Sequence, residues 1–74
     1  MQKVLSERLR LLRKEKELTQ IQLATYCDIT EKAYQNYELM TREPKLDILV
    51  RIADFYGVSL DYLTGRTNER KVNK

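Results

Sequence analysis

Histidine is missing from this 74-residue sequence, which also has only one cysteine, one proline and two glycines. A single cysteine cannot form an intramolecular disulfide or a thiolate metal cluster, and without histidine the chain lacks the commonest metal ligand and acid–base catalyst. The few glycines and prolines argue against a turn-rich β-sandwich or a linker-rich chain. We therefore expect an all-α protein with one small core, no metal, no cofactor and no enzymatic activity.

Long apolar segments are also lacking, because Ile48-Leu49-Val50 is the longest uninterrupted aliphatic run. The N-terminal segment reaches the charged residues Glu7 and Arg8 almost at once. Neither a signal peptide nor a membrane span fits these features. We expect a cytoplasmic protein that does not associate with membranes.

The net charge of +3 is unevenly distributed along the chain. Residues 1–16 carry a net charge of +4, residues 17–65 carry −4 and residues 66–74 carry +3. A protein that binds nucleic acid normally presents a basic face. The acidic middle therefore either argues against such a partner or means that a few residues, and the ends of the chain, contact phosphate.

The first two predicted helices are marked by periodicity and by capping residues. Apolar residues follow a helical stripe over residues 4–16, and the basic residues elsewhere on that helix are expected to form a solvated face. Thr19 and Gln22 match a capping box that starts a second helix. Cys27 is expected to be a small buried residue of that helix, and Asp28 to end it, because aspartate tolerates the left-handed conformation.

A third helix is predicted from the cap residue Thr30 to about Leu39. At 100° per residue, Ala33, Tyr34 and Tyr37 point toward one side. The opposite side carries side chains that can hydrogen-bond with base edges: Glu31, Lys32, Gln35 and Asn36. The second and third helices, joined by a tight turn, have the geometry of a helix-turn-helix.

Two more helices follow a short connector. Pro44 is expected to pre-set the first turn of a fourth helix that ends at Gly57. Ser59 can cap a last short helix over residues 60–64. Five short helices with short connections predict a compact all-α unit.

The chain is expected to divide into one domain, residues 1–65, and a basic tail, residues 66–74. The tail, "RTNERKVNK", has one apolar residue in nine and is predicted to be mobile. Its cations could add weak attraction to DNA or have no specific partner. They are Arg66, Arg70, Lys71 and Lys74.

Residues 4–65 resemble a known family. The stretch "RLRLLRKEKELTQIQLATYCDITEKAYQNYE", followed by a proline and by "IADFYGVSLDYLTG", is similar to the DNA-binding domain of lambda-type phage repressors and Cro proteins, the xenobiotic-response-element class of bacterial regulators. The motifs "LTQxxLA" and "GVSLDYL", and a Tyr-Glu pair that ends the third helix, carry the resemblance. It implies a five-helix lambda-repressor-like fold that binds double-stranded DNA through a helix-turn-helix.

The resemblance assigns roles to particular residues. Base contacts fall on the start of the third helix and one turn further on, at Thr30, Glu31, Lys32, Gln35 and Asn36. Phosphate contacts fall on Gln20, Arg42 and Lys45, and Gln20 can also brace the third helix. Arg13 and Glu38 correspond to a structural ion pair between the first and third helices. Glu31 has a second interpretation, since an acidic residue also suits the N-terminus of a helix.

Three positions depart from the family pattern. Leu39-Met40 replaces the usual Asn-Gly after the third helix and puts a non-glycine where a left-handed residue is expected. Asp28 stands where glycine is common in the turn. Lys45 replaces a small capping residue, so the start of the fourth helix is expected to fray, although a lysine there can also reach phosphate.

A single recognition helix contacts only a few base pairs, so the resemblance implies a homodimer on a palindromic operator. Phe55, Val58 and Tyr62 are candidates for the dimer interface. Packing of the last helix onto the fourth is the alternative, as probable as the interface for Val58 and less so for Phe55.

The leading functional hypothesis is a sequence-specific transcriptional regulator from a bacterium or phage, above all a repressor, with control exerted by concentration, dimerisation or a separate regulatory protein. The alternative is an antitoxin-like or adaptor module that uses its acidic middle to bind a protein. An enzyme is the least favoured class. It would need Cys27 or a carboxylate pair such as Glu15 and Glu17, and neither has a visible base or orienting partner.

Overall fold

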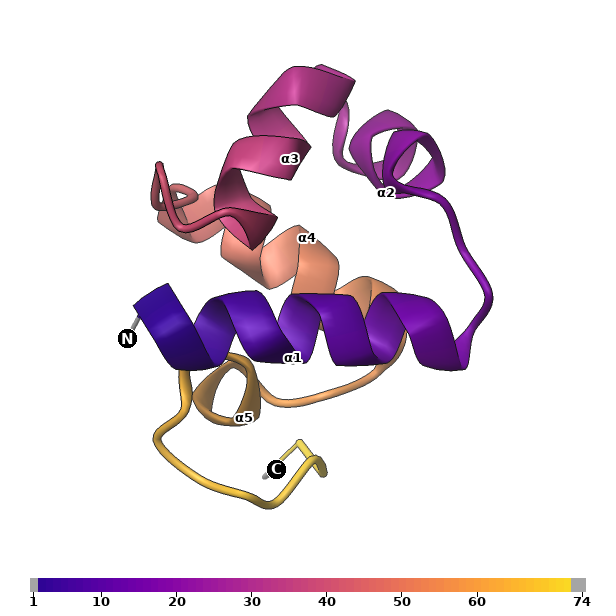
Figure 1. Cartoon of the computed structure of the whole chain (residues 1–74). Helices are drawn as coiled ribbons and strands as arrows, with labels where there is room; N and C mark the ends of the chain where they lie inside the picture. Colours follow the sequence, from indigo (N-terminus) through magenta and orange to yellow (C-terminus); the bar gives the residue numbers. More distant parts are fainter. Residues whose placement is uncertain (1, 73–74) are drawn as a thin grey trace.

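The computed structural model describes residues 2–72, and this part of the chain is built from five helices and contains no strand. The helices are α1 (Gln2–Glu15), α2 (Gln20–Cys27), α3 (Glu31–Glu38), α4 (Leu46–Tyr56) and α5 (Leu60–Thr64). In Figure 1, α1 crosses the middle of the molecule, with α2 and α3 on one side and α5 and the C-terminal segment on the other. The predicted all-α, five-helix fold is confirmed.

The predicted N-terminal caps are present. Thr19 and Gln22 form a full capping box before α2, in which Thr19 Oγ1 accepts from the Gln22 amide at 3.2 Å and Gln22 Oε1 accepts from the Thr19 amide at 2.8 Å. Thr30 and Ser59 cap α3 and α5 with their side-chain oxygens, which accept from the Ala33 amide at 3.1 Å and from the Tyr62 amide at 2.9 Å. Lys45 precedes α4 without a side-chain cap, which matches the expected departure.

Residues in the left-handed conformation lie at or just after the C-terminal ends of α2, α3, α4 and α5, where the residue after α5 is Gly65 with φ 87°. Asp28 and Gly57 have φ angles of 60° and 68° after α2 and α4. After α3 the left-handed residue is Met40, with φ 65°, whereas Leu39 remains in the right-handed region. Pro44 lies outside α4, before the cap residue Lys45. The first turn of α4 therefore starts at Leu46, directly after the cap residue, and Pro44 precedes the cap.

The core lies where α1, α4 and α5 meet, and a second cluster joins α2 to α3. Leu9, Ile52 and Leu63 are fully buried in the first cluster. Leu23 and Tyr34 are fully buried in the second. Within residues 2–72, no helix is both long and apolar enough to cross a bilayer, and no three acidic, cysteine or histidine side chains are grouped to hold a metal ion.

Residues 66–72 lie back against α1 and α5 (Figure 1). The mobility expected for the tail stays a prediction, as does the domain boundary at residue 65. Lys74 lies outside the described residues.

Candidate nucleic-acid interface

The turn between α2 and α3 sets the angle at which α3 leaves the domain. Asp28 takes the left-handed conformation at the end of α2, and the Ile29 amide donates to the Ala24 carbonyl at 3.0 Å. Leu23 and Tyr34 fill the space between the two helices. Because this side of α3 is closed by packing, its opposite side is left at the surface.

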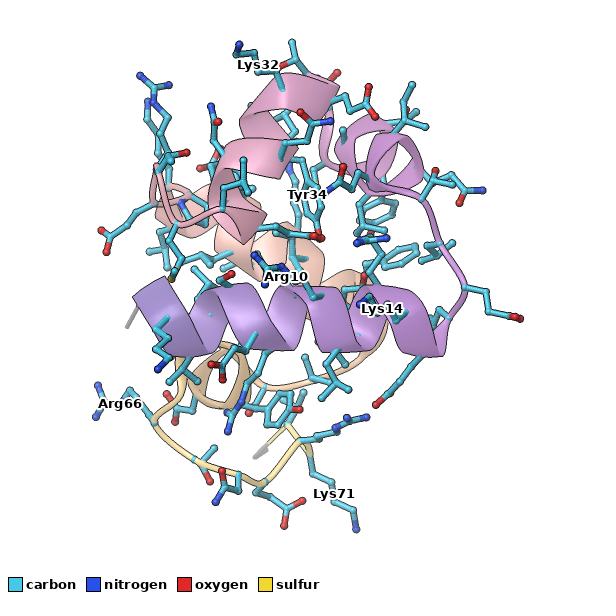
Figure 2. The ribbon with its side chains drawn as sticks, viewed as in Figure 1. Arg10, Lys14, Lys32, Tyr34, Arg66 and Lys71 are labelled. Atoms are coloured by element: carbon cyan, nitrogen blue, oxygen red, sulfur yellow. The ribbon has the colours of Figure 1, made fainter. Side chains whose placement is uncertain are left out.

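The outward side of α3 holds the five residues to which the family resemblance assigns base contacts. Thr30, Glu31 and Lys32 are exposed, and Gln35 and Asn36 are partly exposed. Figure 2 shows Lys32 pointing away from the body of the protein. Thr30 Oγ1 caps α3 by accepting from the Ala33 amide at 3.1 Å. Within the described chain, the other four side chains form no hydrogen bond or ion pair and are free to contact a ligand.

The far end of α3 is held by residues of α1 and α2. The Glu38 carboxylate accepts from Arg13 Nε at 2.8 Å, from Arg13 Nη2 at 3.1 Å and from Gln20 Nε2 at 3.2 Å. The Glu38 backbone carbonyl accepts from Ser6 Oγ and Arg10 Nη2. Figure 2 shows Arg10 on the side of α1 that faces α3. We call Ser6, Arg10, Arg13, Gln20 and Glu38 the Glu38 cluster.

The Glu38 cluster keeps a charged pair inside the fold. Glu38 is only 2% exposed. Burial by itself would raise the pKa of its carboxyl, but hydrogen bonds, above all those from Arg13, hold that pKa below its ordinary value of 4.5. The pairing with Glu38 also raises the pKa of the Arg13 guanidinium. Both groups are charged at neutral pH and compensate one another, so they connect α1 to α3 and leave no free charge for a ligand.

The three residues assigned to phosphate contacts lie before and after α3 in the chain. Gln20 begins α2 and uses its amide nitrogen to contact Glu38, so it braces α3 as the resemblance implies. Arg42 and Lys45 are exposed on the connector to α4, and within residues 2–72 neither side chain is paired. The Arg42 amide donates to the Asn36 carbonyl at 3.4 Å, which keeps the connector beside α3.

Two of the three dimer candidates are corrected by the structure. Val58, between α4 and α5, and Tyr62, on α5, are 6% and 5% exposed and belong to the core cluster in which α1, α4 and α5 meet. Phe55 is half-buried and stacks on Tyr26 with ring centroids 4.5 Å apart. Of the three, only Phe55 retains a partly free surface.

Ser6 and Arg10 were not singled out by the sequence analysis, which placed the basic residues of α1 on a solvated face. Together with Arg13 they are spaced at four and three residues, so they share one face of the helix. That spacing is the signal that could have identified them. The spacing alone does not predict that α3 packs against this face.

Comparison of the sequence with known protein families identifies a helix-turn-helix domain in this chain. The helix-turn-helix family model matches residues 9–63, which include all of α2, α3 and α4. The chain is 47% identical over 66 residues to the uncharacterized HTH-type transcriptional regulator YqaE of Bacillus subtilis (strain 168), covering 88% of this chain and 57% of YqaE.

Two further relatives have more specific names. The HTH-type transcriptional regulator ImmR of Bacillus subtilis (strain 168) is 34% identical over 70 residues, covering 95% of this chain and 55% of ImmR. The cryptic phage CTXphi transcriptional repressor RstR of Vibrio cholerae is 36% identical over 55 residues, covering 74% of this chain and 50% of RstR. The chain thus spans about half the length of the curated relatives it matches, and no solved structure is significantly similar to it.

Proposed function

This chain belongs to the helix-turn-helix family, and from that premise we propose that it binds double-stranded DNA at specific sequences and regulates transcription as a repressor. The observation that carries the proposal is the outward side of α3. Within the part of the chain that the structure describes, four polar side chains stand there without hydrogen-bond or ion-pair partners, on a helix whose other end is held by the Glu38 cluster. The relative RstR is named a transcriptional repressor, which supports the direction of regulation.

The four side chains offer the chemistry that distinguishes base pairs in the major groove. Asparagine and glutamine can pair with adenine through a donor and an acceptor, lysine donates to guanine, and a carboxylate accepts from the cytosine amino group. Gln35 and Asn36 supply the first kind of contact, Lys32 the second and Glu31 the third. A carboxylate also repels phosphate, so Glu31 contributes to discrimination among bases more than to affinity.

The acidic middle of the chain is compatible with this function because some of its acidic residues have structural roles inside the domain. Asp28 makes the turn, and Glu38 is neutralised by Arg13 inside the protein. The backbone amides at the N-termini of α2 and α3 can bind phosphate without a cationic side chain. We assign the remaining phosphate contacts to Gln20, Arg42 and Lys45.

We propose further that the protein acts as a homodimer on a palindromic operator. One recognition helix contacts only a few base pairs, and two copies related by a two-fold axis would place their helices in major grooves roughly 34 Å apart. Phe55 is the remaining candidate for the interface among the three predicted residues. Control of the repressor by a separate regulatory protein belongs to the same proposal.

Selection from a random DNA pool, followed by sequencing, tests whether binding depends on sequence. We expect a motif with two inverted half-sites, and an affinity that falls steeply with added salt because counterions are released from DNA. A pool that shows no enrichment at low salt would contradict sequence-specific binding.

A pair of variants separates the two kinds of contact. Asn36→Ala is expected to lose about 1–3 kcal/mol of preference at particular base pairs. Arg42→Ala is expected to weaken binding to all sequences alike and to reduce the salt dependence by roughly one phosphate contact. Equal and non-selective losses from both variants would refute the assignment of Asn36 to the bases.

The acidic balance of residues 17–65 favours one alternative, an antitoxin-like or adaptor module that binds a protein. Salt distinguishes the two functions, because protein binding lacks the counterion release of DNA binding. If the purified chain retains no DNA even at low salt and instead co-purifies with a protein partner, the alternative is the better account.

A further inference from the structure

The C-terminal segment, residues 66–72, which composition predicts to be a mobile tail, makes several hydrogen bonds with the domain. The Ser59 amide donates to the Arg70 carbonyl at 2.8 Å, and Ser59 Oγ donates to the Glu69 carbonyl at 3.3 Å. The Arg66 amide donates to the Asp61 carbonyl at 2.8 Å. The backbone of the segment is therefore joined to both ends of α5.

Arg8 of α1 contacts both α5 and the C-terminal segment. Its Nη1 donates to the Thr67 carbonyl at 2.7 Å and also to the carbonyl of Tyr62 in α5. Its Nη2 donates to Asn68 Oδ1 at 2.8 Å. One guanidinium therefore contacts α5 and the segment at the same time.

A second arginine contacts α1 from the segment. Arg70 Nη1 and Nη2 donate to the two carboxylate oxygens of Glu15 at 2.9 and 2.7 Å. This geometry is bidentate, as in strong arginine–carboxylate pairs. Both side chains are 43% exposed, so water and salt screen their attraction.

The two arginines lie against the same aromatic ring. The Cζ atoms of Arg8 and Arg70 are 4.1 and 5.2 Å from the centroid of the Tyr62 ring, within the range of cation–π contacts. Tyr62 is only 5% exposed. The ring is thus covered partly by a segment outside the five helices.

We propose that residues 66–72 form a latch, a segment that closes over Tyr62 and opens as salt screens the Arg70–Glu15 pair. The closed latch completes the surface of α1 and α5, and the open latch uncovers Tyr62. Arg8 and Arg70 are committed to this closure, so their charges do not serve as free cations for DNA. In Figure 2 the latch residues Arg66 and Lys71 lie on the far side of α1 from Lys32, so the device is separate from the DNA-contacting side of α3.

Amide hydrogen exchange at Ser59, followed by NMR on the full chain, reports the latch directly, because this amide donates to the Arg70 carbonyl. Arg70→Ala should accelerate exchange at Ser59 roughly three- to thirtyfold, the range expected from losing an exposed ion pair and one cation–π contact. Core amides of α1 and α4 should keep their rates. Sodium chloride at about 1 M should accelerate Ser59 exchange in the unchanged protein and have less effect on Arg70→Ala.

Lys71→Ala is the matched control, since it removes a cation from the same segment that makes no ion pair with the described chain. It should leave Ser59 exchange unchanged. The charge swap Glu15→Arg with Arg70→Glu should restore slow exchange that either single change loses. The proposal is overturned if Ser59 exchanges equally fast in the unchanged protein and Arg70→Ala, or if Lys71→Ala has the same effect as Arg70→Ala. If Arg70→Ala accelerates all core amides alike, the more conservative Arg70→Lys must still show the selective change at Ser59, or the latch is rejected.

Discussion

The first turn of α3 exposes Glu31 and Lys32, whereas the last residue of the same helix, Glu38, is buried and accepts hydrogen bonds from α1 and α2. These two acids are seven positions apart on a helix of eight residues. The difference shows how a short helix can be rigid and still offer free side chains. Its position is set by Tyr34 on the inward side and by Glu38 at the last turn, so the outward residues of the first turn need not take part in packing.

This comparison separates stability from recognition along α3. Changes at the buried end should affect the free energy of unfolding, and changes at the exposed end should affect DNA preference with little effect on unfolding. The following experiments test that separation.

The largest effect is expected from Glu38→Ala. It leaves the Arg13 guanidinium, which is 17% exposed and still donates to the Leu18 carbonyl, without its carboxylate partner. The loss of one partner costs about 3–5 kcal/mol for a fully buried pair, which is the upper bound here. A domain of this length has a total stability of only about 4–11 kcal/mol, so the variant should lose a large part of its stability. Urea unfolding followed by circular dichroism measures the change. Glu31→Ala, which removes the same type of side chain at the other end, is the control, and similar losses in both variants would break the comparison.

A smaller effect is expected from acid. The pKa of the Glu38 carboxyl is lowered in the folded state, so its stabilising contribution is complete above its ordinary value of 4.5 and is lost as pH falls through the folded value. Glu15, paired with Arg70, has a lowered pKa as well, but it is exposed and should contribute less. Urea midpoints between pH 7 and pH 3 should therefore fall less steeply in Glu38→Gln than in the unchanged protein. This order would be contradicted if the urea midpoint of Glu15→Gln depended on pH as weakly as that of Glu38→Gln, or more weakly.

Much of α3 and its surroundings could be predicted from the sequence because the signals are local. Thr19, Thr30 and Asp28 mark helix ends through contacts within four residues, and those contacts are present. The Arg13–Glu38 pair joins distant segments and was expected only from the family resemblance. Periodicity alone does not tell which side of α1 receives α3.

The C-terminal end of the domain was harder to predict for the same reason. Val58 and Tyr62 were considered for a dimer interface because they looked more apolar than a free surface needs. Their burial depends on the distance between α4 and α5, and for Tyr62 also on Arg8 and Arg70, which are 62 positions apart in the sequence. The composition of residues 66–72 is rich in charge and poor in apolar residues, and composition alone does not register contacts made by a few particular side chains.

Met40→Gly is expected to stabilise the protein by about 1 kcal/mol. Met40 follows the buried end of α3 with φ 65°, a left-handed conformation that is unfavourable for a side chain and is relieved by glycine, less the entropy that glycine adds to the unfolded chain. Asp28→Gly is the matched control, since aspartate tolerates the same conformation and should gain less. Thermal unfolding of both variants measures the difference, and a loss of stability in Met40→Gly would show that the side chain has a packing role.

The smallest effect on unfolding is expected from Glu31→Gln, which also decides between the two interpretations of Glu31. Thr30 already caps α3, so the remaining structural role of the carboxylate is its interaction with the helix dipole, about 0.3–1 kcal/mol at an exposed position. A glutamine has nearly the same shape but can donate as well as accept, so it no longer excludes bases other than cytosine. If Glu31 contacts a base, DNA selection with Glu31→Gln should change the preference at one position in each half-site and leave the rest of the motif intact. An unchanged motif, together with a small loss of stability, would mean that Glu31 serves only the helix N-terminus and that recognition rests on Lys32, Gln35 and Asn36.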